Sequence, residues 1–273
     1  MRAPASVHRA LKKPFFGRFQ GEWRWPRGVE RDEWEDVRIR SESGVDLRAV
    51  YAPAKGATRC AVVMAHPMGR TAKGFWLKGG HGELLRDAGA HVLVFDFNGF
   101  GESPSGTFDY PADVLAVGRY MAERHGDLPI GIVGASFGGA WAICAMARSH
   151  PFRAALIEST FPTLADFWKD YPLPHATLRL LSAVAPRLER RLRPVEQAKH
   201  LQGQPTVELL YSNTDPHTPV AYGERLLLPL QQSTSASLRT VERADHTFIL
   251  RDDPDRYAEA VERMLEATRE PHG

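Results

Sequence analysis

Cysteine is almost absent from this sequence, and long hydrophobic runs are missing altogether. The two cysteines, Cys60 and Cys144, form no CxxC motif and lie in no Cys/His cluster with metal-ligand spacing. Neither a disulfide framework nor a metal site is therefore predicted, and both residues are expected to be small apolar members of the core. No stretch approaches the ~18 uninterrupted apolar residues that a membrane-spanning helix requires. These absences indicate a soluble globular protein.

A strong charge of one sign is also lacking, because the 273 residues carry a net charge of only +2. Residues 1–30 hold seven Lys or Arg and two Glu, a local charge of +5, which leaves −3 for the remainder. A body so close to neutral lacks the cationic stripe of a nucleic-acid-binding domain, so no nucleic-acid partner is expected. The basic N-terminal residues include no continuous apolar stretch of the kind found in a secretory signal, and a cytoplasmic location is the simplest expectation.

The first 35 residues form a segment that we call the N-terminal arm, in which basic and aromatic side chains are mixed. It shows no long helical periodicity, and an arm that packs on the domain or is partly disordered is the favoured interpretation. Weak contact with an anionic membrane surface is the alternative, because basic and aromatic residues together suit such a surface. The residues concerned are Lys12, Lys13, Arg18, Arg24, Arg27, Phe15, Phe16, Phe19, Trp23 and Trp25.

After the arm, short apolar runs alternate with stretches long enough for helices. Two runs on either side of Ser43-Gly44 predict an antiparallel hairpin, and six later runs predict strands of a parallel sheet buried on both faces. A terminal amphipathic helix is expected to begin at Pro254. The fold class is therefore α/β, with about eight mostly parallel strands and helices on both faces. The runs are Val37–Ser41, Val45–Ala52, Cys60–Ala65, His91–Phe95, Ile130–Ala135, Ala154–Ile157, Thr206–Tyr211 and Leu238–Val241.

The alternation of predicted strands and helices is interrupted in residues 161–201, where prolines separate short helical segments. We interpret this stretch as a small helical cap inserted into a core made of residues 36–160 and 202–273. Loops after the carboxyl ends of parallel strands carry ligand contacts, so the cap is expected to shape a substrate pocket. The cap contains four clustered arginines, which either lie on a solvated helix face or attract an anionic substrate. They are Arg187, Arg190, Arg191 and Arg193.

The motif with the clearest chemistry is Gly134-Ala135-Ser136-Phe137-Gly138, which lies between a predicted strand and a predicted helix. A serine raised on a sharp strand-to-helix turn needs small residues two positions away on either side, and Gly134 and Gly138 meet that requirement. We therefore predict Ser136 as a nucleophile. A plain glycine turn is the structural alternative.

A serine hydroxyl is a weak nucleophile at neutral pH and needs a base, which in turn must be held in the correct tautomer. His246 lies just beyond the last predicted strand, where a loop can reach back over the strand ends. Asp215 follows the run that ends at Tyr211, and the residues between it and His246 suffice for one helix and one strand. Glu158, at the end of the preceding strand, is the alternative acid.

Acyl transfer by such residues also needs donors for the oxyanion, and backbone N–H groups supply them. The N–H of Phe137, directly after the nucleophile, is the first expected donor. The second should come from His66-Pro67-Met68-Gly69, after the 60–65 strand. Because Pro67 has no N–H, we predict Met68 as the donor and His66 as a supporting residue.

Taken together, these residues resemble the α/β-hydrolase superfamily from about Val37 to the C-terminus. Asp96–Ser103 is similar to the DxxGxGxS segment of these enzymes, which implies a supporting loop beside the active-site entrance. Glu158–Asp166 resembles the cap entrance of BEM46-like and serine-aminopeptidase-like hydrolases. Two departures stand out: relatives often have His-Gly where this chain has His66-Pro67, and membrane-anchored relatives carry an N-terminal spanning helix. Because this sequence shows no such spanning helix, a substrate within a lipid bilayer is in doubt.

The expected function is hydrolysis of a small-molecule carboxylic ester or thioester through an acyl-enzyme, without a cofactor. Two alternatives remain open. The same groups could cleave an amide or peptide, or the chain could be a non-catalytic binding protein that keeps the fold. The oligomeric state is not indicated by the sequence.

Overall fold

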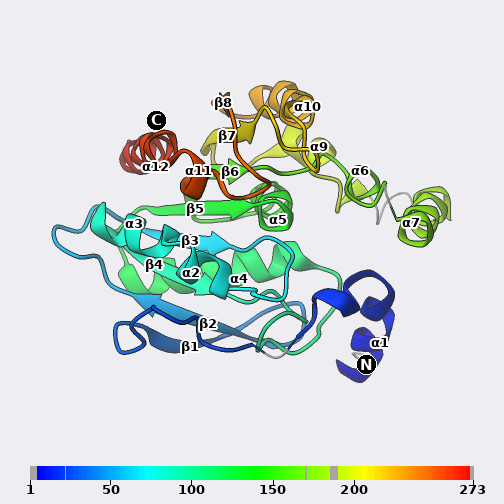
Figure 1. Cartoon of the computed structure of the whole chain (residues 1–273), viewed down its shortest axis with the longest axis horizontal. Helices are drawn as coiled ribbons and strands as arrows, with labels where there is room; N and C mark the ends of the chain where they lie inside the picture. Colours follow the sequence, from blue (N-terminus) through cyan, green and yellow to red (C-terminus); the bar gives the residue numbers. More distant parts are fainter. Residues whose placement is uncertain (1–4, 22, 170, 185–189, 271–273) are drawn as a thin grey trace.

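The computed structural model describes residues 5–21, 23–169, 171–184 and 190–270, and these form one eight-stranded sheet with helices on both faces (Figure 1). The strands are β1 (Glu35–Arg40), β2 (Asp46–Ala52), β3 (Cys60–Ala65), β4 (Ala90–Phe95), β5 (Ile130–Ala135), β6 (Phe152–Glu158), β7 (Thr206–Ser212) and β8 (Ala236–Val241). The helices are α1 (Ala5–Phe16), η1 (Gly17–Phe19), α2 (Gly74–Lys78), α3 (His81–Asp87), α4 (Tyr110–His125), α5 (Phe137–Met146), α6 (Leu164–Phe167), α7 (Pro172–Val184), α9 (Pro194–Gln197), η2 (Ala198–His200), α10 (Val220–Gln231), α11 (Ile249–Asp252) and α12 (Pro254–Arg269).

The strand order is β1-β2-β4-β3-β5-β6-β7-β8. Pairing is antiparallel between β1 and β2 and between β2 and β4, and parallel from β4 to β8. Each predicted strand is present, with small shifts at its ends, and the terminal helix begins at Pro254 as expected. The predicted α/β class and mostly parallel sheet are therefore confirmed.

The two faces of the sheet are buried because successive side chains of each strand point to opposite sides. In β3, Ala61 and Val63 contribute to the core that α4, α5 and α10 cover, whereas Val62 and Met64 pack under α2, α3, α11 and α12. Every residue of β3 and of β5 is buried. A strand covered on both faces reads as a continuous apolar run, which is why these two strands could be located from sequence.

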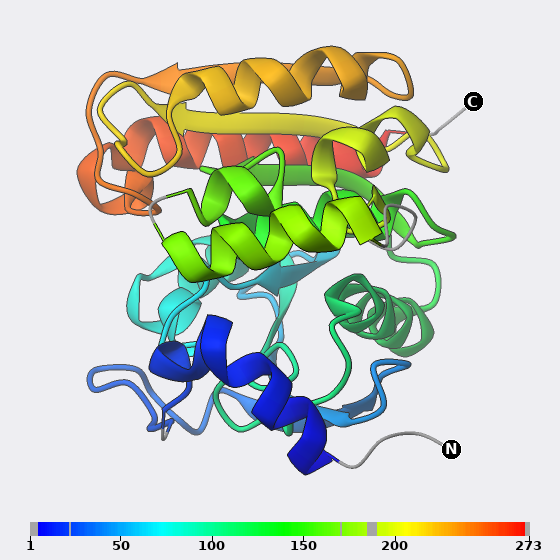
Figure 2. The same cartoon turned by 90° about the vertical axis from the view of Figure 1, so that its right-hand side faces the viewer.

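Residues between β6 and β7 form the helical insertion, which contains α6, α7, α9 and η2. Figure 2 shows α7 crossing one side of the molecule, with α1 on the same side. Of the four cap arginines, Arg187 lies outside the described residues, and Arg190 and Arg191 are exposed. None of the described helices is long and apolar enough to cross a membrane.

The N-terminal arm packs on the domain, and its residues Ala5–Phe16 form the amphipathic helix α1, contrary to the expectation that the arm has no long helical periodicity. Tertiary contacts explain the difference, because most of the stability of a short helix comes from packing. Phe16 is 4% exposed and packs edge-on against Phe100 and Phe137, with ring centroids 5.7 Å away in both cases. It also contacts Trp168, at the end of α6, so α1 joins the core to the insertion.

Lys12 of α1 is fully buried, contrary to the usual position of a lysine. Its Nζ donates to the backbone and side-chain oxygens of Asn98 and lies 4.4 Å from the ring centroid of Tyr110. Burial lowers the pKa of Lys12 to about 7, and the nearby Asp113 carboxylate only partly opposes this effect. One of the arm's basic residues is thus part of the interior.

Candidate active site

Ser136 lies on the sharp turn between β5 and α5, as the sequence predicted. Its backbone has φ 48° and ψ −111°, a conformation that costs a non-glycine residue about 1–3 kcal/mol and persists only where the surroundings enforce it. Two hydrogen bonds do so: the Ser136 N–H donates to the Glu158 carbonyl at 2.8 Å, and the Thr160 hydroxyl donates to the Ser136 carbonyl at 2.7 Å. The turn is therefore held from the end of β6.

The two predicted glycines leave no space for a side chain. A Cβ on Gly134 would lie 2.9 Å from the Cα of Gly139 in α5. A Cβ on Gly138 would lie 2.8 Å from the carbonyl oxygen of His66 and closer still to that of Ala65. Close approach to the end of β3 is thus what requires glycine at residue 138. The same approach places the start of α5 beside Ala65 and His66.

The structure brings together the three side chains that the sequence selected. The Nε2 of His246 lies 3.1 Å from the Oγ of Ser136, and its Nδ1 lies 2.7 Å from the Oδ2 of Asp215. The Asp215 side chain is fully buried, whereas that of His246 is 22% exposed. These distances and this order are those of a nucleophile, its base and the acid that orients the base.

Asp215 is held by a set of donors that the sequence analysis did not identify. Its Oδ1 accepts the N–H groups of His217 at 2.8 Å and Thr218 at 3.1 Å, and its Oδ2 accepts the Thr218 hydroxyl at 2.6 Å. Burial raises the pKa of Asp215, but hydrogen bonds from His246 and Thr218 outweigh it and lower the pKa overall. A signal was available, because Asp followed by Thr three residues later is a pattern of local side-chain to backbone hydrogen bonding.

The backbone N–H groups of Phe137 and Met68 are the predicted oxyanion donors. Phe137 is the first residue of α5, where backbone N–H groups have no partner within the helix. Within the described part of the chain, no acceptor is bonded to the backbone N–H of Phe137 or Met68. Both groups are therefore available to a ligand.

His66 supports this region as a neutral side chain. Its Nδ1 donates to the carbonyl of Pro67 at 2.8 Å, and its Nε2 accepts the N–H of Phe97 at 3.1 Å, which together define the tautomer. Burial lowers the pKa of His66 to about 4. The residue thus connects the ends of β3 and β4 without taking up a proton at neutral pH.

The family is decided by the sequence of the central part of the chain. Residues 56–247 match the family model described as "Serine aminopeptidase, S33". The chain belongs to the serine aminopeptidase S33 family. This is an α/β-hydrolase family, in agreement with the sheet order and with the resemblance noted from the sequence. None of the curated proteins compared matches the chain.

Solved structures similar to this S33-family chain include esterases and a peptidase. A Pyrococcus furiosus esterase, Pf2001, has a TM-score of 0.70 and 19% identity over 90% of this chain and 95% of its own. The butyrate-bound esterase Est2 of Thermogutta terrifontis has a TM-score of 0.67 and 17% identity over 89% and 96%. For a Pyrococcus horikoshii acylaminoacyl peptidase the values are 0.65 and 14%, over 88% of this chain and 43% of the peptidase. At these low sequence identities, the structural similarities establish the fold alone.

In this S33-family chain, Glu158 does not occupy the position of the orienting acid. Its Oε1 accepts the N–H of Ile249 at 3.2 Å, and its Oε2 is buried without a hydrogen-bond partner among the described residues. Burial raises the pKa of Glu158 to about 7, and the negative charge of Asp215 acts in the same direction. Among the two acids considered from the sequence, Asp215 is the one bonded to His246.

We expect Glu158 to make the stability of the protein fall as the pH rises. The folded state holds the Glu158 proton up to about pH 7, whereas the ordinary pKa is 4.5, so the stabilisation is complete below 4.5 and is lost as the pH rises through 7. Glu158→Gln keeps an acceptor for Ile249 and removes the charge. Its unfolding free energy relative to wild type should rise by about 3 kcal/mol between pH 4.5 and pH 8, measured by urea denaturation.

The matched control for this experiment is Glu242→Gln, which removes the same charge from an exposed position on the surface. It should change the unfolding free energy equally at both pH values. If Glu158→Gln also gave a difference that did not vary with pH, the Glu158 carboxyl would not retain its proton in the folded state.

The Asp96–Ser103 loop of the S33-family chain is held by a buried ion pair. Lys73 Nζ lies 2.6 Å from Asp96 Oδ2, and both side chains are at most 1% exposed. The backbone N–H groups of Lys73 and Glu102 also donate to the Asp96 carboxylate. The predicted supporting loop thus depends on Lys73, which the sequence analysis did not single out. Within the described residues, no group of three or more His, Cys, Asp or Glu side chains could hold a metal ion.

Proposed function

We propose that this chain is a serine hydrolase that cleaves a small-molecule carboxylic ester or thioester through an acyl-enzyme. The observation that carries the proposal is the pair of contacts made by His246, 3.1 Å to Ser136 Oγ and 2.7 Å to Asp215 Oδ2. Membership of the S33 family and the strained turn at Ser136 support the same conclusion.

In the first half of the proposed reaction, Ser136 Oγ attacks the carbonyl carbon while His246 Nε2 takes the hydroxyl proton. The Asp215 carboxylate stabilises the imidazolium that forms and keeps Nδ1 protonated. The negative charge on the former carbonyl oxygen is bound by the N–H groups of Phe137 and Met68. The tetrahedral intermediate then expels the alcohol or thiol, which receives the proton from His246.

In the second half, water attacks the acyl group on Ser136 and gives a proton to His246 Nε2. Collapse of the second tetrahedral intermediate releases the carboxylic acid and returns the proton to Ser136 Oγ. The chemistry needs nucleophile, base and oxyanion donors, all of which the chain itself supplies. No cofactor is part of the proposed mechanism.

Cleavage of an amide or peptide is the second candidate, and two observations favour it. The family is described as a serine aminopeptidase family, and an acylaminoacyl peptidase is among the proteins of similar fold. The same groups would act, but an amine is a poorer leaving group than an alcohol or a thiol. Ester cleavage and amide cleavage can be distinguished with pairs of substrates that carry the same acyl chain and different leaving groups.

The proposal predicts that the protein hydrolyses p-nitrophenyl acetate, butyrate or octanoate, and that a fluorophosphonate probe labels Ser136. Release of p-nitrophenol and p-nitroaniline is measured for the same acyl groups as ester and anilide, and the labelled peptide is mapped by mass spectrometry. Each kcat/KM is divided by the rate constant of uncatalysed hydrolysis, because the esters are intrinsically more reactive. A larger enhancement for the esters supports the ester assignment, and a larger enhancement for the anilides supports the amide. Absence of both labelling and turnover would leave a binding protein that retains the fold.

A further inference from the structure

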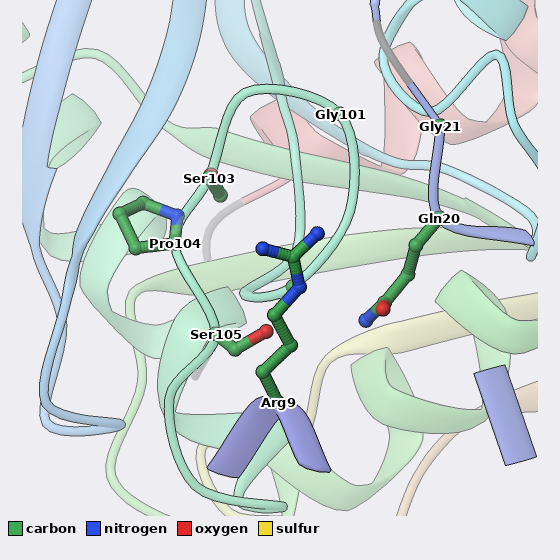
Figure 3. Close-up of a pocket in the computed structure, with 8 residues that line it drawn as sticks. Arg9, Gln20, Gly21, Gly101, Ser103, Pro104 and Ser105 are labelled. Atoms are coloured by element: carbon green, nitrogen blue, oxygen red, sulfur yellow. The ribbon is translucent and has the colours of Figure 1, made fainter. Parts of the chain in front are cut away.

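A cavity of about 360 Å³ lies between the N-terminal arm and the loop that follows β4 (Figure 3). Arg9 of α1, Gln20, directly after η1, and Gly21 contribute from the arm. The loop contributes Gly99, Gly101, Ser103, Pro104 and Ser105. None of the three triad side chains lines it. The volume is at the lower end of the range for small-molecule sites, about 300–1,000 Å³. It is therefore a concave feature whose lining does not include the triad.

Polar groups without partners converge in this cavity. Within the described residues, the Arg9 guanidinium has no hydrogen bond or ion pair, and the Ser105 hydroxyl has no hydrogen bond. The Nε2 of Gln20 is buried and has no partner there either. Figure 3 shows the Arg9 side chain extending toward the loop, with the Ser105 hydroxyl and the Gln20 amide facing the same space. A buried donor without a partner costs free energy, which a bound acceptor would recover.

Gly99 keeps this space open. It has φ +86°, and a Cβ on it would lie 3.0 Å from Ser105 Oγ and 3.2 Å from Gln20 Nε2. A side chain at this position would therefore occupy the point on which the two polar groups converge. Glycine is required both by the backbone conformation and by the room that the polar groups surround.

The charges around the cavity favour an anion. No Asp or Glu lines it, and Arg9 contributes a full positive charge. Lys12 lies directly behind Gly99, because its Cδ would be 3.7 Å from a Cβ there. Two buried carboxylates lie near this region, and both already have donors: Asp96 is bonded to Lys73 and to the Glu102 N–H, and Asp113 accepts from Ser41 and Asn98.

We propose that this cavity binds the phosphate group of a phosphate monoester. A guanidinium, an amide and a hydroxyl approach from different sides, and a tetrahedral anion with three terminal oxygens can accept from all of them. A planar carboxylate has only two oxygens to offer. The volume left beside the phosphate accommodates a small attached group. The same phosphate chemistry is offered by a soluble ester and by a lipid headgroup.

The test is calorimetric titration of the full chain with inorganic phosphate and with glycerol 3-phosphate, in a buffer free of other oxyanions. We expect saturable binding, with the affinity reduced about tenfold in Arg9→Gln through loss of the charge-assisted hydrogen bonds. Gln20→Met should weaken binding severalfold although it changes no charge. Lys13→Gln removes the same charge from an exposed position of α1 and is the matched control, expected to bind within twofold of wild type.

Flotation with phosphatidylcholine vesicles, with and without phosphatidic acid, identifies the source of the phosphate. Binding to the soluble esters that depends on Arg9 and Gln20 supports a soluble ligand, and the same dependence seen only with phosphatidic acid supports a lipid headgroup. Equal losses in Arg9→Gln and Lys13→Gln would show a general effect of surface charge and overturn the site. Absence of binding to inorganic phosphate, to glycerol 3-phosphate and to vesicles that contain phosphatidic acid would do the same. Circular dichroism melting of each variant shows that it is folded.

Discussion

Ser136→Ala is expected to lower kcat/KM for the best p-nitrophenyl ester by about 10⁴-fold or more, the range found when the nucleophile of a serine hydrolase is removed. The reason is that His246 Nε2, 3.1 Å from Ser136 Oγ, would have no hydroxyl from which to take a proton. The measurement is the initial rate of p-nitrophenol release under subsaturating substrate. Fluorophosphonate labelling should disappear in the same variant.

Ser136→Gly is the control that separates chemistry from folding. It should be as inactive as the alanine variant, yet more stable by about 1 kcal/mol, because glycine adopts φ 48° without strain. Thermal unfolding of both variants tests this. Activity within tenfold of wild type in Ser136→Ala would contradict the assignment of the nucleophile.

Asp215→Asn is expected to lower kcat by about 10³- to 10⁴-fold. Two backbone N–H groups, those of His217 and Thr218, donate to Oδ1, so the amide oxygen of the asparagine would occupy that position. Its NH₂ group would then face His246 Nδ1, which could accept but no longer donate. The proton would move to Nε2, and His246 could not accept the proton of Ser136.

Glu158→Gln is the control for the choice of acid, because it alters the other carboxylate that the sequence offered. Its activity should stay within about threefold of wild type, since Gln retains an acceptor for Ile249 and no contact with His246 is lost. The two variants are compared on the same ester. A loss in Glu158→Gln as large as in Asp215→Asn would make Glu158 the orienting acid.

The sheet could be read from the sequence because its signals are local. Strands β3 and β5 are buried on both faces and therefore appear as apolar runs, and the glycines beside Ser136 are required by the turn itself. The order of Asp215 and His246 along the chain follows from the topology once the strands are known. The fold and the candidate triad could thus be predicted from short stretches of sequence.

The features that the sequence did not indicate depend on contacts between distant residues. Helix α1 packs against Phe100, Phe137 and Trp168, contacts that no run of neighbouring residues indicates. A lysine is expected at the surface, and the burial of Lys12 is explained by the Asn98 oxygens, the Tyr110 ring and the Asp113 carboxylate, all of which lie far from it in the sequence. The sequence favoured an arm that packs on the domain, but it did not indicate which residues the arm contacts.

The packing of Phe16 has a consequence for folding during synthesis. Helix α1 is made before its partner Trp168, which follows Phe16 by about 150 residues; at ~5–20 residues per second this is roughly 8 to 30 s of translation. Until then, Phe16 has no complete surface on which to dock, although most of the sheet can already form. Helix α1 is therefore expected to reach its native place only after strands β1 to β6 have been made.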